Sequence, residues 1–127
     1  METTISQQLI EAYLEAYNRF DVEGMVVHLH DEVVFRNIAD GEITLATTGK
    51  ALFRQQAEQA TAYFSRREQR ATGWQTVGQG IEVGIDYTAT VAISLPNGLQ
   101  PGDTLRLQGR SVFQFEAGKI ISIEDIS

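Results

Sequence analysis

The sequence predicts an α+β fold in which helices pack on one face of a curved antiparallel sheet. Apolar residues recur at helical spacing through the first twenty residues and again from residue 49, whereas from residue 81 they alternate as in a half-buried strand. The expected order is therefore helix, helix, strand, helix and four long strands. At 127 residues the chain suits one domain, residues 1–127, and a strongly curved sheet closed by helices makes a cone.

The first helix is predicted to begin at Thr3 or Thr4 and to end near Arg19, because Thr4 with Gln7 three residues later fits a capping box. Its apolar stripe comprises Ile5, Leu9, Ala12, Tyr13, Ala16, Tyr17 and Phe20. Asp21 then offers its carboxylate as the N-cap of a second helix, which carries Leu29 and closes at residues 31–32. A strand is expected to follow from Val33.

A third helix is predicted from Gly49 to near Arg67, because apolar residues recur at helical spacing from Phe53 to Phe64. Residues 37–48 show no helical period and carry a turn signal at Asp40-Gly41, so a loop or an irregular strand is expected there. The mixed charges of residues 66–70 are interpreted as a solvated helix end.

Everything after Gln69 is predicted to be antiparallel sheet. In residues 81–93 every odd position is apolar, and a bulge or kink is expected at Gly84 because the strand is unusually long. Further strands are predicted at 105–115 and 120–126, joined by a hairpin turn. Gly109 and Ser111 interrupt the apolar face of the first of these, and such small side chains predict cavity volume at that point.

Composition narrows the function classes. A formal net charge of −7 repels phosphate backbones, so no nucleic acid is expected as a partner. The chain has no cysteine, which excludes disulfides and zinc-thiolate sites. The polar N-terminus lacks the features of a secretion signal, and no stretch approaches the ~20 apolar residues that span a bilayer. A soluble cytoplasmic protein without a membrane partner is therefore expected.

The two histidines do not suggest a metal site. His28 and His30 are placed on the second helix by the prediction above, where their spacing points them about 200° apart. His28 is expected at the surface or rim, and His30 near the C-terminus of the helix. No clustered carboxylates accompany them, so neither a metal nor another cofactor is expected.

Four segments carry a resemblance to a known superfamily. They are AYNRFDVEGM at 16–25, LHDEVVF at 29–35, TGKALFRQQ at 48–56 and FEAGKIISIED at 115–125. In this order they resemble the nuclear-transport-factor-2-like superfamily, which includes ketosteroid isomerases and SnoaL-like polyketide cyclases. The resemblance implies a cone-shaped, cystatin-like sheet with three N-terminal helices packed on its concave face and a ligand cavity at the wide end of the cone.

The resemblance to ketosteroid isomerases allows a comparison of individual positions. Their oxyanion-hole tyrosine falls on Tyr13, and their second oxyanion donor falls on Ser111, whose hydroxyl can still donate. Their general-base aspartate falls on Asn37, and an amide cannot take a proton from carbon at neutral pH. Isomerase chemistry of that type is therefore disfavoured, while three polar side chains remain that could orient a carbonyl or hydroxyl group.

The resemblance to SnoaL-like cyclases draws attention to a base on the last strand. Ile121, Ile123 and Asp125 share a strand face, so Asp125 is expected to point into the cavity. A buried carboxylate with a raised pKa is a suitable general base. Asp125 and Tyr13 are therefore the candidate catalytic residues. Because Asp125 lies two residues from the chain end, an ordinary solvated carboxylate is the alternative.

Aromatic and small polar side chains are the candidates for lining a ligand cavity, although core packing explains aromatic residues equally well. The candidate substrate-binding residues are Tyr13, Tyr17, Asn37, Phe53, Trp74, Tyr87, Ser111 and Phe113. For Tyr13 and Tyr17 the competing interpretation is core, and for Asn37 it is a turn at a strand end.

The predicted function is a small-molecule-binding protein of the SnoaL-like type, acting as an isomerase, cyclase or hydratase on a hydrophobic carbonyl compound if it is an enzyme. The alternative is a non-catalytic dimeric binding or association module with a vestigial pocket. The resemblance also implies a homodimer formed through the sheet face that carries Arg106 and Arg110, for which a solvated face is the alternative.

Overall fold

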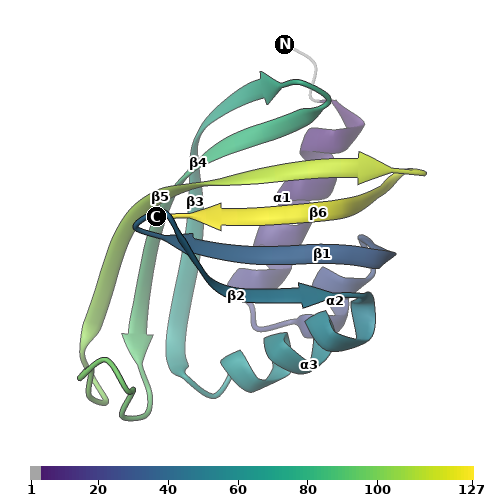
Figure 1. The fold of residues 1–127 in the computed structure, drawn as a ribbon. Helices are drawn as coiled ribbons and strands as arrows, with labels where there is room; N and C mark the ends of the chain where they lie inside the picture. The colour runs from purple at the N-terminus through teal and green to yellow at the C-terminus, as the bar shows by residue number, and fades with distance from the viewer. Residues whose placement is uncertain (1–3) are drawn as a thin grey trace.

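The computed structural model describes residues 4–127 and contains three helices and six strands within that range (Figure 1). The first half holds α1 (Ile5–Asn18), α2 (Val22–Val26), β1 (Leu29–Ala39), β2 (Glu42–Thr48) and α3 (Lys50–Ala60). The second half holds β3 (Phe64–Val77), β4 (Gly80–Val91), β5 (Thr104–Glu116) and β6 (Lys119–Ile126). The expected order of elements, with four strands after the third helix, is confirmed, and residues 42–48, where a loop or an irregular strand is expected, form the additional strand β2.

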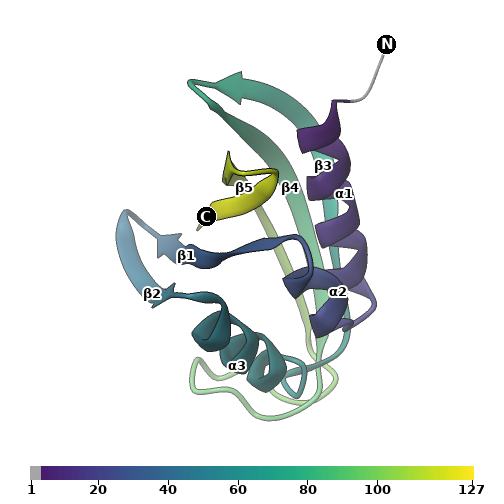
Figure 2. The same cartoon turned by 90° about the vertical axis from the view of Figure 1, so that its right-hand side faces the viewer.

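The six strands form one curved sheet in the order β2-β1-β6-β5-β4-β3. Neighbouring strands are antiparallel except β1 and β6, which run parallel. The long strands β3, β4 and β5 bend strongly, so that the sheet wraps around the side that carries the helices (Figures 1 and 2). The predicted α+β architecture, with helices on the concave face of a cystatin-like sheet, is confirmed.

The first helix begins as the capping box predicts. The Thr4 side chain accepts a hydrogen bond from the backbone N–H of Gln7 at 3.0 Å, and Thr4 is the N-cap of α1. The other proposed start, Thr3, lies outside the described residues. At the C-terminal end, Phe20 adopts a left-handed backbone with φ of 60°, which turns the chain out of α1.

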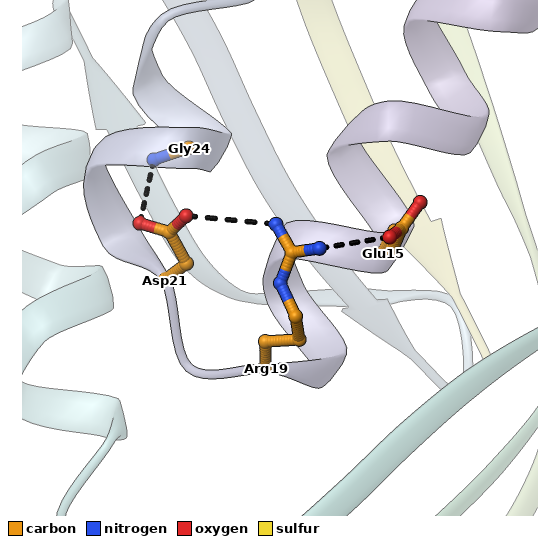
Figure 3. A network of polar contacts seen from close by, with 4 residues as sticks. All are labelled: Glu15, Arg19, Asp21 and Gly24. Carbon is orange, nitrogen blue, oxygen red and sulfur yellow. Dashed lines mark hydrogen bonds and ion pairs between the residues drawn. The ribbon is translucent and has the colours of Figure 1, made fainter.

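The joint between α1 and α2 is held by polar contacts (Figure 3). Asp21 is the N-cap of α2 and accepts from the Gly24 N–H at 2.9 Å, as the sequence predicts. The Arg19 guanidinium lies 2.8 Å from a Glu15 carboxylate oxygen and 3.7 Å from Asp21. Both ion pairs are exposed to solvent, so each contributes little to the free energy of unfolding.

The second helix is shorter than predicted. It ends at Val26, and β1 already starts at Leu29, so the expectation of a helix through residues 31–32 is wrong. Leu29 is fully buried because it pairs with Ile120 of β6, and the carbonyl of His28 accepts a hydrogen bond from the Ile120 N–H at 2.9 Å. An apolar residue three positions after Val26 suits a helix and a strand equally, and the β6 partner decides between them.

The third helix is also shorter than predicted, because it ends at Ala60 and not near Arg67. The Thr61 hydroxyl donates to the carbonyl of Glu58 at 2.6 Å, and the Tyr63 carbonyl accepts from the Ala92 N–H at 2.8 Å. Phe64 continues the helical spacing but pairs with Val91 in the sheet. Residues 66–70 are consequently part of β3, and their interpretation as a solvated helix end is wrong.

Three further segments refine the prediction. Residues 37–48 form most of a β1–β2 hairpin that turns at Asp40-Gly41, where both residues have positive φ. The strand expected at 81–93 spans Gly80–Val91. The irregularity expected at Gly84 lies on the partner strand, between Ala71 and Gly73, and Gly84 lacks a Cβ where one would collide with Thr72.

The hydrophobic core lies between the helices and the concave face of the sheet. Its fully enclosed side chains include Ile10, Leu29, Val33, Val83, Phe113, Ile120 and Ile123. No helix among residues 4–127 is both long enough and apolar enough to span a membrane. The concave surface that the core leaves uncovered is available to form a site.

Candidate functional site

A cavity of about 430 Å³ lies on the concave side of the sheet. All three helices and all six strands contribute residues to its lining. Seven of the sequence-predicted site residues line it, namely Tyr13, Tyr17, Asn37, Phe53, Tyr87, Ser111 and Asp125. Its volume and its mainly apolar lining suit a small organic molecule.

The cavity lies where small residues on β5 predict open volume. Gly109 and Ser111 both line it, and Leu107 lies beside them on the same face. Gly109 also allows the end of β6 to approach, because a Cβ at this position would collide with the Ile126 carbonyl. Small residues on this part of β5 therefore provide both space and close strand packing.

Asn37, Asp125 and Ser111 occupy one row across three adjacent strands. Asp125 on β6 pairs with Asn37 on β1 on one side and with Ser111 on β5 on the other. Residues in register on neighbouring strands project from the same face, so the three side chains all lie on the cavity side. The Ser111 hydroxyl donates a hydrogen bond of 2.6 Å to Asp125 Oδ1, whereas the Asn37 amide donates to Thr44 Oγ1 at 2.7 Å.

The environment of Asp125 favours its neutral form. Burial raises the pKa of Asp125 from 3.8 to about 6, although the hydrogen bond from Ser111 acts in the opposite direction. The pKa of Tyr13 is raised by burial first and by the Asp125 charge second. Tyr13 therefore remains a protonated hydrogen-bond donor at neutral pH. It lies close enough to Asp125 for the carboxylate charge to affect its pKa.

A second polar group lies around Tyr17 and Tyr87. Their hydroxyl oxygens share a hydrogen bond of 2.8 Å. Burial raises the pKa of both phenols, so both hydroxyls stay protonated at neutral pH. Together with Tyr13 they give the apolar cavity three hydroxyl groups.

Arg67 is a cavity residue that the sequence analysis missed. It lies on β3 with 5% of its surface exposed, and it lines the cavity together with Gln69. Gln69 and Ser111 are buried polar side chains as well, and both line the cavity with Arg67. Alternation in β3, where residues 66, 68 and 70 are exposed, would have placed Arg67 inside had the segment been assigned to a strand.

Two nominated residues lie away from the cavity. Trp74 sits near the far end of β3, is 36% exposed and pairs with Val83. Phe113 is fully buried beneath the cavity, where its ring packs edge-on against Tyr13 at a centroid distance of 5.9 Å. Phe113 therefore supports Tyr13 from the core.

The histidines occupy separate positions outside the cavity. His28 precedes β1, and burial together with nearby Lys119 lowers its pKa. His30 lies within β1 and not on a helix as expected, with its Nε2 3.5 Å from a Glu116 oxygen. No group of three or more potential metal ligands occurs among the described residues.

A model of the SnoaL-like domain family matches residues 10–123. The chain belongs to this family. The match begins within α1 and ends within β6, so it overlaps every element that lines the cavity and stops two residues before Asp125. The resemblance to the nuclear-transport-factor-2-like superfamily is thereby confirmed. No significant match was found among curated protein sequences.

Solved structures share the fold of this SnoaL-like protein at low sequence identity. A candidate polyketide cyclase from Xanthomonas campestris superposes with a TM-score of 0.79 and 21% identity, covering 97% of this chain and 90% of that one. An epoxide hydrolase of the LEH-like type from M. tuberculosis superposes with a TM-score of 0.76 and 17% identity. The match covers 99% of this chain and 84% of that one.

A third structure is a protein from Catenulispora acidiphila with a ketosteroid isomerase-like fold, in complex with trimethylamine. It superposes with a TM-score of 0.77 and 12% identity, and the match covers 94% of this chain and 85% of that one. The first two structures are described by different chemistries and the third by its fold, so the shared fold leaves the reaction to be argued from the site.

Proposed function

We propose that this SnoaL-like protein binds a hydrophobic carbonyl compound in its cavity and that Asp125 is the general base of a proton-transfer reaction on it. The observation that carries the proposal is the position of Asp125. This carboxylate lies in a mainly apolar cavity, flanked in register by Asn37 and Ser111, and has a pKa raised to about 6. A base with such a pKa is mostly ionised at neutral pH and still basic enough to accept a proton.

The proposed step is removal of a proton from the carbon next to a carbonyl group. Asp125 would take this proton, and negative charge would develop on the carbonyl oxygen. Tyr13 lines the same cavity as a protonated donor, so its hydroxyl would stabilise that oxygen. The neutral Asp125 could then return the proton to the same carbon or to another carbon, which is the shared step of isomerisations and of many ring closures.

The apolar part of the lining supports a hydrophobic substrate. Phe35, Phe53 and Ile85 line the cavity together with Leu45 and Leu107. These side chains offer no hydrogen bonds, so they favour a ring system with few polar groups. An apolar lining lowers the local polarizability of the site, which strengthens the electrostatic interaction of Asp125 with the reacting atoms.

The test is hydrogen–deuterium exchange at the carbon next to the carbonyl of bicyclic ketones, starting with 2-tetralone, followed by NMR in D₂O. The protein is expected to accelerate exchange above the buffer rate. Asp125→Asn should lower the acceleration by about a hundredfold or more, because general-base catalysis commonly contributes that much. Glu124→Gln is the matched control, since Glu124 is the preceding residue of β6 and forms an ion pair with Arg36.

The alternative is a binding module without catalysis, and the same experiment separates the two. If none of the ketones exchanges faster with the wild type than with Asp125→Asn, the general-base proposal fails. Saturation-transfer NMR signals from the ketones with both proteins would then favour the binding module.

We further propose that the chain forms a homodimer through the outer face of the sheet and acts in the cytoplasm. The outer face is polar: Arg110 pairs with Glu82 at 3.2 Å, and Arg70 pairs with Asp86 at 2.7 Å. Such a surface suits a polar homodimer interface. Light scattering coupled to size exclusion should give the mass of two chains, and a single-chain mass would contradict the dimer.

A further inference from the structure

Arg67 is a buried cation without a counter-charge in the described part of the protein. Its side chain is 5% exposed and lines the cavity. Among residues 4–127, no carboxylate forms an ion pair with it, and its Nη2 is enclosed without a hydrogen-bond partner. Buried charges in proteins are normally paired, so this arrangement is electrostatically incomplete.

The contacts that Arg67 does make hold it in place without neutralising it. Its Nε donates a hydrogen bond of 2.8 Å to the Tyr17 carbonyl. Its guanidinium carbon lies 3.7 Å from the centroid of the Tyr17 ring and 4.5 Å from that of the Phe20 ring. A cation fixed in this way is preorganised to receive an anion, because its orientation is already set before a ligand arrives.

A second unsatisfied group also belongs to the cavity lining. In residues 4–127, the enclosed side-chain polar atoms without a partner are Arg67 Nη2 and Thr47 Oγ1, and both residues line the cavity. The buried Gln69 lies two residues along β3 and lines it as well. Unsatisfied polar atoms are rare in folded proteins, so their presence at one cavity points to a ligand that brings polar groups of its own.

We infer that Arg67 anchors an acidic oxygen of the ligand, so that the cavity takes a hydrophobic acid: a ring system bearing an ionised carboxylate or phenolate. Arginine is suited to this role because its planar guanidinium pairs with such oxygens at two points. The apolar lining would hold the rings, and the Tyr17–Tyr87 hydroxyl pair lies beside the anchor.

The position of Asp125 is compatible with this ligand. Asp125 lies on β6, three strand positions from Arg67 on β3. Tyr13 and Tyr87 lie near both charged groups, because the Asp125 charge raises the pKa of each phenol and the Arg67 charge lowers it. A ligand anchored by its acidic oxygen at Arg67 could therefore extend its ring carbons toward Asp125. The inference rests on the proposed function for its choice of cavity but does not need catalysis.

The test compares two probes of nearly equal shape, 2-naphthoate and the neutral 2-naphthamide, by isothermal titration calorimetry at pH 7.5. The wild type should bind the naphthoate more tightly by about tenfold or more, because a charge-assisted pair is lost in the amide. Arg67→Gln should abolish this preference while binding of the naphthamide changes little. Arg67→Lys keeps the charge and should retain part of the preference.

Arg70→Gln is the matched control, because it removes the same charge from an exposed position on the same strand. It should keep the preference of the wild type. Asp125→Asn should bind the naphthoate at least as tightly as the wild type, since it removes a like charge. Its exchange activity toward 2-tetralone would be lost, so failure of the base and failure of the anchor are separate results.

A measurement on the wild type covers the case in which Arg67→Gln does not fold. The Arg67 Nε–Hε resonance should shift when 2-naphthoate is added and stay in place with 2-naphthamide. Three results would each overturn the inference. They are equal affinity of the wild type for both probes, an unchanged preference for the naphthoate in Arg67→Gln, and an Arg67 resonance that does not shift when 2-naphthoate is added.

Discussion

The hydroxyl of Ser111 donates a hydrogen bond of 2.6 Å to Asp125, across the pairing of β5 with β6. Ser111 is 2% exposed, so this donor is held in the cavity wall and cannot readily turn to water. The bond stabilises the ionised carboxylate in a place where burial favours the neutral acid. The two effects together determine the pH at which Asp125 becomes a base.

Ser111→Ala should raise the pKa of Asp125 further, by about one unit, because a hydrogen bond to a charged group is worth about 1.5 kcal/mol or more. The carboxyl ¹³C resonance of Asp125, followed through a pH titration, reports this value. Ser122→Ala on β6, the strand that carries Asp125, is the control and should leave the titration unchanged. A pKa that stays constant or falls in Ser111→Ala would show that the hydroxyl does not stabilise the carboxylate.

Asp125 should also make folding pH-dependent. Its pKa is higher in the folded protein than the ordinary value of 3.8, so the folded state binds the proton more tightly and loses stability as pH rises from about 4 to about 6. Asp125→Asn carries no such charge. The free energy of unfolding of the variant relative to the wild type should therefore increase, by on the order of 2 kcal/mol, between about pH 4 and about pH 7.

Urea denaturation of both proteins at the two pH values measures this difference, and titration of all other groups cancels in the comparison. Glu124→Gln should show a much smaller change, since the Glu124 side chain is 31% exposed and does not line the cavity. A relative stability that does not vary with pH would mean that Asp125 is solvated.

Much of the fold follows from the sequence because local patterns and tertiary contacts agree there. The capping residues Thr4 and Asp21 and the alternation in β4 predict their elements correctly. The errors fall at Leu29 and Phe64, where apolar spacing fits a helix and a strand equally. At both positions a distant partner strand decides the structure, and no local pattern contains that information.

The residues of the candidate site also differ in whether the sequence alone predicts them. Strand periodicity predicts the orientation of Asp125, and the resemblance points to Asn37 and Ser111. The structure brings the three into one row. The charged neighbours of Arg67 predict a solvated helix end, and this prediction misses the inward position of Arg67 on β3. Trp74 is a candidate as a large aromatic residue, and aromatic character does not distinguish a cavity wall from a half-exposed sheet end.

The hydroxyl pair of Tyr17 and Tyr87 should contribute to stability as a unit. Tyr17→Phe or Tyr87→Phe alone should lower the free energy of unfolding by about 1 to 2 kcal/mol, because each leaves a partly buried hydroxyl without its partner. The double variant should lose less than the sum, with a coupling of about 1 kcal/mol. Tyr63→Phe serves as the control, and strict additivity would argue against the bond.

Phe113 and Trp74 should differ sharply when truncated. Phe113→Ala removes a fully buried ring from the core and should lower the free energy of unfolding by about 3 to 5 kcal/mol. Trp74→Ala removes a ring that is 36% exposed at the end of β3, and should cost less than about 2 kcal/mol. Chemical denaturation measures both, and similar losses would contradict the assignment of Phe113 to the core and Trp74 to the periphery.

The central claim is that the cavity holds a carboxyl group suited to proton transfer near neutral pH. The most direct test is the pKa of Asp125 itself, measured from its side-chain ¹³C resonance in the wild type, with Asp125→Asn used to assign the signal. The structure predicts a value of about 6. A value at or below the ordinary 3.8 would place the carboxylate in water or beside an unseen cation, and would contradict its role as the base.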